Sequence, residues 1–461
     1  MQKNTLEKNL TEGSVAIQLI KFALPFMLSN LIQTLYNVAD MVIVGNYTGT
    51  EGISGVNIGG QVTFIITNIV IGLSVGGTVV IAQYLGSGDR RGMSESIKTL
   101  ITFLLAAAVV LTVSMLLLSD TILHWMQTPP EAYQQAKDYL NITLTGTIFI
   151  FGYNAFSAIL RGLGDSKRPL IFVTIACVVN VFLDLLLVGV FDMGAAGAAY
   201  ATVVSQAMSM IACIIYLIRT DFDFDFKLSS FKFYKNRFFM LLKVGIPISI
   251  QNVITNFSFL VLTTIANGMG VSASAAVGIV GKYNGFAILP AIAVGSSVSA
   301  MVAQNMGAGM IDRAKKTFHT GYGLAFSVSL AVFVITQLIP GQILSLFGDD
   351  PEMIAAGVQY VRTFSLDYLI VPATFCLNGL ITGSGHTIIS SVGGIMASLG
   401  FRIPTAILLG IVLDKGLLGL GLAAPVASLG ALVLLLAYYL TGKWKNSTVV
   451  KGQPVLLDVE V

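Results

Sequence analysis

Long, nearly uncharged runs of residues recur along the whole chain. Twelve of them reach about twenty residues or more, the length that an α-helix needs to cross roughly 30 Å of hydrocarbon. The pattern predicts an all-α chain with twelve membrane-spanning helices. The predicted spans lie near residues 15–44, 52–84, 99–119, 139–160, 169–190, 194–218, 238–268, 273–305, 318–339, 353–381, 387–412 and 416–441.

The composition leads to the same conclusion. Of the 461 residues, 55% are hydrophobic and 11% are charged, and the mean hydropathy is +0.83. A soluble globular domain covers its surface with many more polar side chains. We therefore expect an integral membrane protein that contacts the lipid bilayer and has no nucleic acid partner.

Basic residues are concentrated in alternate loops. They precede the first predicted span and follow the second, fourth, sixth, eighth and twelfth, whereas loops such as 120–131 and 340–352 carry acids and almost no bases. Because lysine and arginine are retained on the cytoplasmic side, we expect a multi-pass protein of the cell membrane with both termini in the cytoplasm. The basic positions are Lys3, Lys8, Arg90, Arg91, Lys98, Arg161, Lys167, Arg168, 227–237, 313–316, Lys443 and Lys445.

The chain also repeats itself. KFALPFMLSN from residue 21 recurs as KVGIPISIQN from 243, AQYLGSG from 82 as AQNMGAG from 303, RGLGDS from 161 as TGSGHT from 382, and GAAYATVVS from 197 as GLAAPVAS from 421. These pairs predict two six-helix lobes related by a pseudo-two-fold axis along the membrane normal. The predicted domains are an N-lobe (1–218), a cytoplasmic linker (219–237), a C-lobe (238–445) and a cytoplasmic tail (446–461).

The glycine-rich turns of the repeat do not match a nucleotide-binding pattern. No GxxxxGK[ST] motif occurs in the sequence, which argues against ATP hydrolysis. We interpret the turns as tight cytoplasmic connections at equivalent places in the two lobes. The three cysteines lie in predicted spans and the three histidines lack ligand spacing. We expect neither an enzyme nor a cofactor.

Three acids fall well inside predicted spans, namely Asp40, Asp184 and Asp367. An ionised side chain at the bilayer centre costs about 2.5 to 3.5 kcal/mol on insertion scales, so such groups typically mark ion or proton pathways. Asn180 shares a helix face with Asp184 at i and i+4, and Thr202 adds a hydroxyl in a small-residue run. These groups suit either a protonation site or a monovalent cation. Interhelical hydrogen bonding that serves packing alone is the alternative.

The second half places bases where the first half has acids. Lys282 and Arg402 lie in apolar sequence, and a buried base needs a partner. Asp367 is the obvious candidate, which predicts a structural or gating ion pair. Direct substrate contact and extension to the membrane interface are the alternatives.

Taken together, the repeat, the Pro25 helix ending in NVADMVIVG, the two AQ turns, the RGLGDSKRP loop and the Asn180/Asp184 pair resemble the multidrug and toxic compound extrusion family over essentially the whole chain. The four polar residues of the first half are similar to the site of the DinF-like branch. The resemblance implies that Asp40, Asn180, Asp184 and Thr202 hold the coupling proton or sodium ion.

The resemblance is not uniform across branches. NorM-like and eukaryotic members carry a glutamate in the seventh span, where this chain reads QNVITNFSF. Asp367 does resemble a C-lobe acid of NorM-like members. The resemblance thus leaves a second cation site at Asp367, with Lys282 and Arg402 nearby, as one reading of the second half.

The expected function is cation-coupled export by alternating access, with the proton or sodium ion as coupling ion and small amphipathic, often cationic, organic compounds as substrates. Pro25 removes a backbone donor and permits a kink in the first helix. We expect Gln33, Tyr36 and Asn37 to face the substrate cavity of a monomeric protein, amid a lining rich in Met, Phe and Tyr. A lipid-linked oligosaccharide flippase and a passive channel are the alternative functions.

Overall fold

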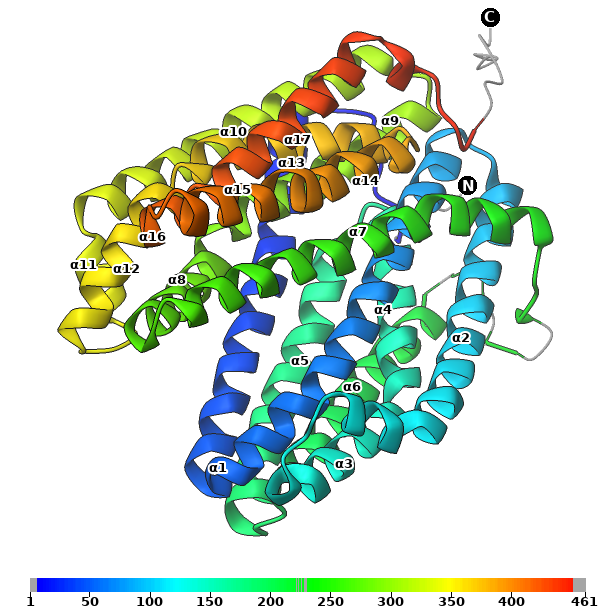
Figure 1. Cartoon of the computed structure of the whole chain (residues 1–461). Coiled ribbons are helices and arrows are strands. Elements are labelled where there is room, and N and C mark those ends of the chain that lie inside the picture. The colour runs from blue at the N-terminus through cyan, green and yellow to red at the C-terminus, as the bar shows by residue number, and fades with distance from the viewer. Residues whose placement is uncertain (1–5, 221, 223, 225, 228–229, 451–461) are drawn as a thin grey trace, which may run out of the picture. The chain divides into compact units, whose positions relative to one another are not determined.

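The structure is a computed structural model that describes residues 6–220, 222, 224, 226–227 and 230–450. These residues form helices joined mostly by short turns, and no β-strand occurs among them (Figure 1). The predicted all-α class is therefore confirmed.

The described residues of the first half begin with one long helical element that reverses direction. Gly49, with φ 64° and ψ −166°, interrupts α1 and divides it into the spans Val15–Gly49 and Gly52–Gly86. The positive φ is one that glycine adopts without a Cβ penalty. The elements are α1 (Val15–Gly86), α2 (Arg90–Trp125), α3 (Pro130–Thr145), α4 (Thr147–Gly162), α5 (Lys167–Asp184), the π-helix η1 (Leu185–Val190) and α6 (Gly194–Ile218).

The second half is divided into more and shorter helical pieces. Its elements are α7 (Lys235–Gly268), α8 (Val271–Ala287), α9 (Leu289–Gly307), α10 (Ile311–Leu338), α11 (Pro340–Ser345), α12 (Pro351–Phe364), α13 (Asp367–Gly383), α14 (Thr387–Ile395), the π-helix η3 (Met396–Arg402), α15 (Ile403–Ile407), the π-helix η4 (Leu408–Val412), α16 (Gly416–Gly421), α17 (Ala423–Leu440) and the 3-10 helix η5 (Lys443–Lys445).

The described helices agree with the predicted number of spans. Nine are long and apolar enough to cross a membrane, and three bent pairs qualify when each pair is taken as one span. The pairs are α3 with α4 (45°), α8 with α9 (44°) and α12 with α13 (45°). Counting each pair as one broken span gives the predicted twelve. The α3/α4 and α12/α13 bends occupy corresponding places in the repeat.

Two compact units are present, and their boundaries differ from the predicted domains. The first comprises Met1–Asn9, Leu28–Ile81 and Asp89–Ile246, and the second comprises Leu10–Met27, Ala82–Gly88 and Pro247–Val461. The start of α1 belongs to the second unit because its apolar face packs there: Leu19 and Phe22 share a buried core with Val298, Met301 and other residues of that unit. Packing thus separates the start of α1 from the lobe to which the repeat assigned it.

The predicted linker, 219–237, is packed against the first unit in its described part. Phe224 is buried and forms edge-to-face contacts with Phe226 and Phe231, at ring-centre distances of 5.0 Å and 5.1 Å. Phe226 also lies 5.7 Å from the ring of Phe156 in α4. The aromatic residues of the linker thus pack against one another and against α4.

Each of the repeated glycine loops holds a terminal segment of the chain. In the first unit, Lys8 donates its backbone N–H to Leu163 O (2.8 Å) and its Nζ to the buried Asp165 (3.0 Å). In the second unit, Thr448 donates its hydroxyl to Gly385 O, at 2.8 Å. The loops are tight turns, as predicted, and they also anchor the ends of the chain. Of the predicted tail, 446–450 is anchored here, and 451–461 lies outside the described residues together with Lys3.

The repeated AQ turns contact each other inside the second unit. A Cβ atom added at Gly86 would collide with Gln304 O, and one added at Gly307 would collide with Gln83 O. The two glutamines are buried: Gln83 donates to Gly383 O (2.7 Å), and Gln304 Oε1 accepts from Leu10 N (3.0 Å). Glycine is required in both turns because the helix ends touch through their backbones.

Candidate cation-binding site

Three helices of the first unit carry the four predicted polar residues. Asp40 lies on α1, Asn180 and Asp184 lie on the last turns of α5, and Thr202 lies on α6. The i, i+4 spacing places Asn180 and Asp184 on one face of α5. Asp184 is also the last α-helical residue before the π-helix η1, and such local changes of helix type occur often at functional sites.

The structure brings these side chains together. Asp40 and Asp184 lie within electrostatic reach of each other. Tyr36, one turn before Asp40 on α1, lies within electrostatic reach of both acids, and its Oη is 3.4 Å from Thr202 Oγ1. Residues from α1, α5 and α6 therefore form one polar cluster in apolar helices.

The cluster has more hydrogen-bond acceptors than donors. Asn180 and Asp184 are each 0% exposed. Both carboxyl oxygens of Asp184, both amide atoms of Asn180 and Oδ1 of Asp40 have no hydrogen-bond partner among the described residues. A buried polar group without a partner costs about 1 to 3 kcal/mol. A proton or cation shared by the two carboxyl groups would satisfy these oxygens.

The donor set fits a proton or a hard monovalent ion. Carboxylate, amide and hydroxyl oxygens are ligands of hard cations. Within the described part of the chain, no group of three or more His, Cys, Asp and Glu side chains could hold a metal ion. Two acids, one amide and one threonine supply hard oxygen ligands, in keeping with the predicted cation.

Tyr139 on α3 is a member of the cluster that the sequence did not indicate. It is buried beside Ile43 and Val188, and Asp40, Tyr36 and Asp184 all act on it electrostatically. A tyrosine in an apolar span is ordinary in a membrane protein, so no sequence signal distinguished it. Tyr139 thus adds a fourth helix, α3, to the surroundings of the acids.

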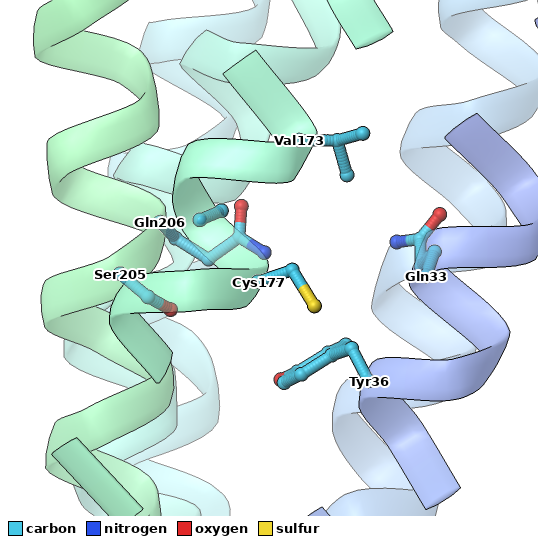
Figure 2. Close-up of a pocket in the computed structure, with 7 residues that line it drawn as sticks. Gln33, Tyr36, Val173, Cys177, Ser205 and Gln206 are labelled. Carbon is cyan, nitrogen blue, oxygen red and sulfur yellow. The ribbon is translucent and has the colours of Figure 1, made fainter. Parts of the chain in front are cut away.

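A small pocket lies between α1, α5 and α6 (Figure 2). Gln33 and Tyr36 face it from α1, opposite Cys177 on α5 and Gln206 on α6. Tyr36 therefore belongs to both the pocket and the acid cluster. The cavity volume is about 10 Å³, room for about one water molecule and far below the roughly 300 Å³ at the lower end for sites that bury a drug-sized compound. The full lining is Gln33, Tyr36, Val173, Ala176, Cys177, Ser205 and Gln206.

Two predictions about the cavity differ from this pocket. Asn37 does not line it and is exposed one residue further along α1. Tyr36 is the one aromatic member of this lining, so a substrate cavity rich in Met, Phe and Tyr stays a prediction. Tyr36 and Asn37 are consecutive and lie about 100° apart around the helix, so their side chains point in different directions. Ser205 and Gln206, which face the pocket from α6, were not predicted.

Arg402 is the buried base of the second unit. It ends the π-helix η3 and is 7% exposed. Its Nη1 donates to Ser258 Oγ on α7 at 2.7 Å, and its guanidinium lies 4.1 Å from the centre of the Phe259 ring. The guanidinium is therefore held by a hydroxyl and an aromatic face.

Asp367 and Arg402 interact without direct contact. Asp367 is 5% exposed and acts electrostatically on Arg402, yet the described residues include no ion pair within 4.0 Å between them. The predicted ion pair is therefore not formed, because the Arg402 guanidinium contacts Ser258 and Phe259 instead.

Lys282 does not share this site. Its side chain is exposed on α8, and no ion pair involves it among the described residues. The prediction that it is a buried base in need of a partner was wrong. A Cβ atom added at the neighbouring positions Gly281 or Gly285 would meet nothing within 4 Å, so this face of α8 is not closely packed against the described residues.

Pro25 lies within an uninterrupted stretch of α1. The helical assignment continues through it, and the non-helical residue inside α1 is Gly49. Proline still removes one backbone donor from the helix. The predicted role of Pro25 in a conformational change stays a prediction.

Comparison with known proteins gives concordant results. The MatE family model matches residues 25–186 and 247–408, two segments that begin 222 residues apart. The chain is 29% identical over 443 residues to the "Probable multidrug resistance protein YpnP" of Bacillus subtilis (strain 168), covering 95% of this chain and 97% of that one.

Solved structures share the fold. A MATE in the straight conformation matches with a TM-score of 0.89 at 23% identity, covering 97% of this chain and 99% of that one. A MATE in the bent conformation matches with a TM-score of 0.86 at 24% identity, covering 95% and 97%. The double family match agrees with the internal repeat, and the helices agree with the solved fold. This multi-pass membrane chain belongs to the MatE family.

Proposed function

We propose that this protein is a secondary active multidrug exporter that exchanges small amphipathic organic compounds for a proton or a sodium ion. The observation that carries the proposal is the pair of interacting carboxyl groups, Asp40 and Asp184, whose buried oxygens lack donors. The relative in Bacillus subtilis named as a probable multidrug resistance protein supports the substrate class.

The site supplies a way to couple the two ligands. Two carboxylates in one apolar site repel each other unless a proton or cation is bound. Tyr36 lies on the same helix as Asp40 and lines the adjacent pocket. Cation binding that draws Asp40 towards Asp184 would therefore displace Tyr36 and change the pocket. A cation drives release in this way because it binds the two states of α1 with different affinity.

The pocket is suited to one end of a substrate. Gln33 and Gln206 offer amide hydrogen bonds, and the Tyr36 ring offers a face for an aromatic or cationic group. Acids nearby favour positively charged compounds. The flippase alternative gains no support from this uncharged lining, because recognition of pyrophosphate calls for arginines.

The energy of an ion gradient is sufficient. One proton that crosses about 100 mV gains roughly 2.3 kcal/mol, and one pH unit adds about 1.4 kcal/mol. Together these support roughly a several-hundredfold concentration gradient of a neutral solute. We further propose that the protein works as a monomer in the cell membrane with both termini in the cytoplasm, consistent with its basic loops.

Dye efflux from proteoliposomes tests the proposal. Purified protein is reconstituted with a planar cationic dye, and proton and sodium gradients are imposed separately. We expect efflux under at least one gradient and its loss in Asp40→Asn and Asp184→Asn. Absence of efflux under both gradients, or unaltered coupled efflux in both variants, would contradict the proposal.

A further inference from the structure

We propose that the segment at the start of α7 binds an anionic phospholipid of the cytoplasmic leaflet through Lys232 and Lys235. These bases belong to the basic aromatic segment, residues 230–239. The inference goes beyond ion-coupled export, because it concerns the lipid around the protein and not its substrate. It relies on the proposed cytoplasmic placement of the basic loops.

The charge of this region has one sign. Residues 227–243 contain five bases and no acid, and they include the start of α7, which is long and apolar enough to span a membrane. A cluster of bases directly on the cytoplasmic side of a span is typical of contact with anionic lipids. The aspartates of the linker, Asp221, Asp223 and Asp225, come earlier in the chain and lie outside the described residues.

Contacts with α2 hold the basic aromatic segment in place. Tyr234 donates its backbone N–H to Thr99 Oγ1 at 3.2 Å, and Arg237 Nε donates to Glu95 Oε2 at 3.1 Å. Both helices belong to the first unit at these positions. The segment is therefore a folded part of that unit, and its outward side chains project from a fixed backbone.

The segment presents an exposed apolar surface. Phe238 packs edge-to-face on Phe103 of α2, with 5.0 Å between the ring centres. The ring centres of Phe233 and Phe239 lie 4.6 Å and 5.5 Å from that of Phe238. Phe233 and Phe239 are nevertheless 53% and 56% exposed. Phenylalanine rings next to bases are suited to the boundary between lipid headgroups and acyl chains.

Lys232 and Lys235 lie beside these rings in the sequence and have no ion pair. Both side chains are exposed, and neither lies within 4.0 Å of an acid among the described residues. Arg237 differs, because Glu95 already pairs with it. A lysine stem can pack along apolar surface while its ammonium group reaches a phosphate. Two unpaired positive charges favour a headgroup with net negative charge over a zwitterionic one.

Site-resolved lipid labelling tests the inference. The full-length protein is reconstituted in phosphatidylcholine vesicles with photoactivatable phosphatidylglycerol, and mass spectrometry measures labelling of residues 230–239. We expect stronger labelling than with photoactivatable phosphatidylcholine. The apparent affinity for phosphatidylglycerol should fall roughly 30-fold in Lys232→Gln/Lys235→Gln, because each base near an anionic surface contributes about fivefold.

Matched variants separate this site from a general effect of charge. Lys232→Arg/Lys235→Arg keeps both charges and should keep the affinity of the parent. Lys315→Gln/Lys316→Gln removes two exposed bases near the start of α10, and labelling of residues 230–239 should not change. Size-exclusion chromatography confirms folding, and the single variants Lys232→Gln and Lys235→Gln should each lower the affinity about fivefold.

Three results would overturn the inference. They are equal labelling by the two lipids, an unchanged affinity in folded Lys232→Gln/Lys235→Gln, and displacement of the lipid by inorganic phosphate, which would indicate a site for soluble anions. The measurement needs neither an ion gradient nor a dye. Its failure is therefore distinguishable from a failure of dye efflux, which would contradict the proposed export.

Discussion

The two units carry the same repeat and differ in how they treat a buried acid. In the first unit, Asp40 and Asp184 interact and their oxygens lack donors. In the second unit, Asp367 is buried without a second acid beside it, and Arg402 is the charged group that acts on it. The units share the repeat and the α3/α4 and α12/α13 bends, but their buried charges differ. An ion site thus depends on which charges a fold leaves uncompensated, and much less on the fold itself.

The largest effect is expected at the buried acids of the first unit, whose charge must be compensated by an ion from solution. Asp184→Asn removes half of the proposed ion site, and we expect ion-driven dye efflux to fall by about 100-fold or more, since groups of this kind are the intramembrane ion ligands. Initial efflux rates in proteoliposomes measure this. Asp120→Asn is the matched control, because that acid is exposed and paired with Lys137. Equal losses of efflux in Asp184→Asn and Asp120→Asn would mean that the buried acid has no special role in ion coupling.

The next effect concerns Asp367, the buried acid of the second unit, and the neighbouring charge of Arg402. Arg402→Gln leaves Asp367 buried without a counter-charge, and we expect a loss of about 3 to 5 kcal/mol in stability. Thermal unfolding of the purified protein measures this loss as a lower Tm. Asp367→Asn in the same molecule should recover most of it. Additive losses in the double variant would show that the two side chains do not interact.

The repeated glycine loops sharpen the comparison further. The first unit anchors Lys8 through the buried Asp165, which also binds Arg168, whereas the second unit anchors Thr448 with a neutral hydrogen bond. We expect Asp165→Asn to cost about 2 to 3 kcal/mol, and Thr448→Val about 1 kcal/mol. Tm values of the two variants measure the difference. A larger loss in the second unit would reverse the ranking.

The smallest effect is expected at the residue that joins the pocket and the acids. Tyr36→Phe keeps the ring and removes the hydroxyl that lies 3.4 Å from Thr202 Oγ1. We expect a several-fold decrease in apparent ion affinity, corresponding to about 1 kcal/mol. Efflux rates as a function of ion concentration test this. An unchanged ion dependence would mean that Tyr36 does not link the two sites.

Much of the fold was predictable because it follows from local properties of the chain. Apolar length specified the spans, and similarity between distant segments specified the repeat. Asp40, Asn180, Asp184 and Thr202 were predictable as a set because acids and amides are costly in hydrocarbon and stand out from their neighbours. Asp40 and Asp184 lie within electrostatic reach of each other, and the joint role of the four residues in binding a cation stays a prediction.

Other members of the sites were not predictable because their roles depend on neighbours distant in sequence. Tyr139 reads as an ordinary aromatic residue until α3 places it beside the acids. Lys282 and Arg402 look alike in sequence, but α8 exposes the first, and Ser258 and Phe259 hold the second. Burial and partner choice are properties of several helices at once.

The sequence by itself determined that this chain is a helical membrane protein built from a repeated unit, with acids in its interior. Hydrophobicity and periodicity are additive along a chain, so they can be summed without coordinates. Only the tertiary structure decided which charges face each other, which compensate each other and which end of α1 packs with which unit. Electrostatic energy depends on the distance between groups, and distances exist only after the helices have packed.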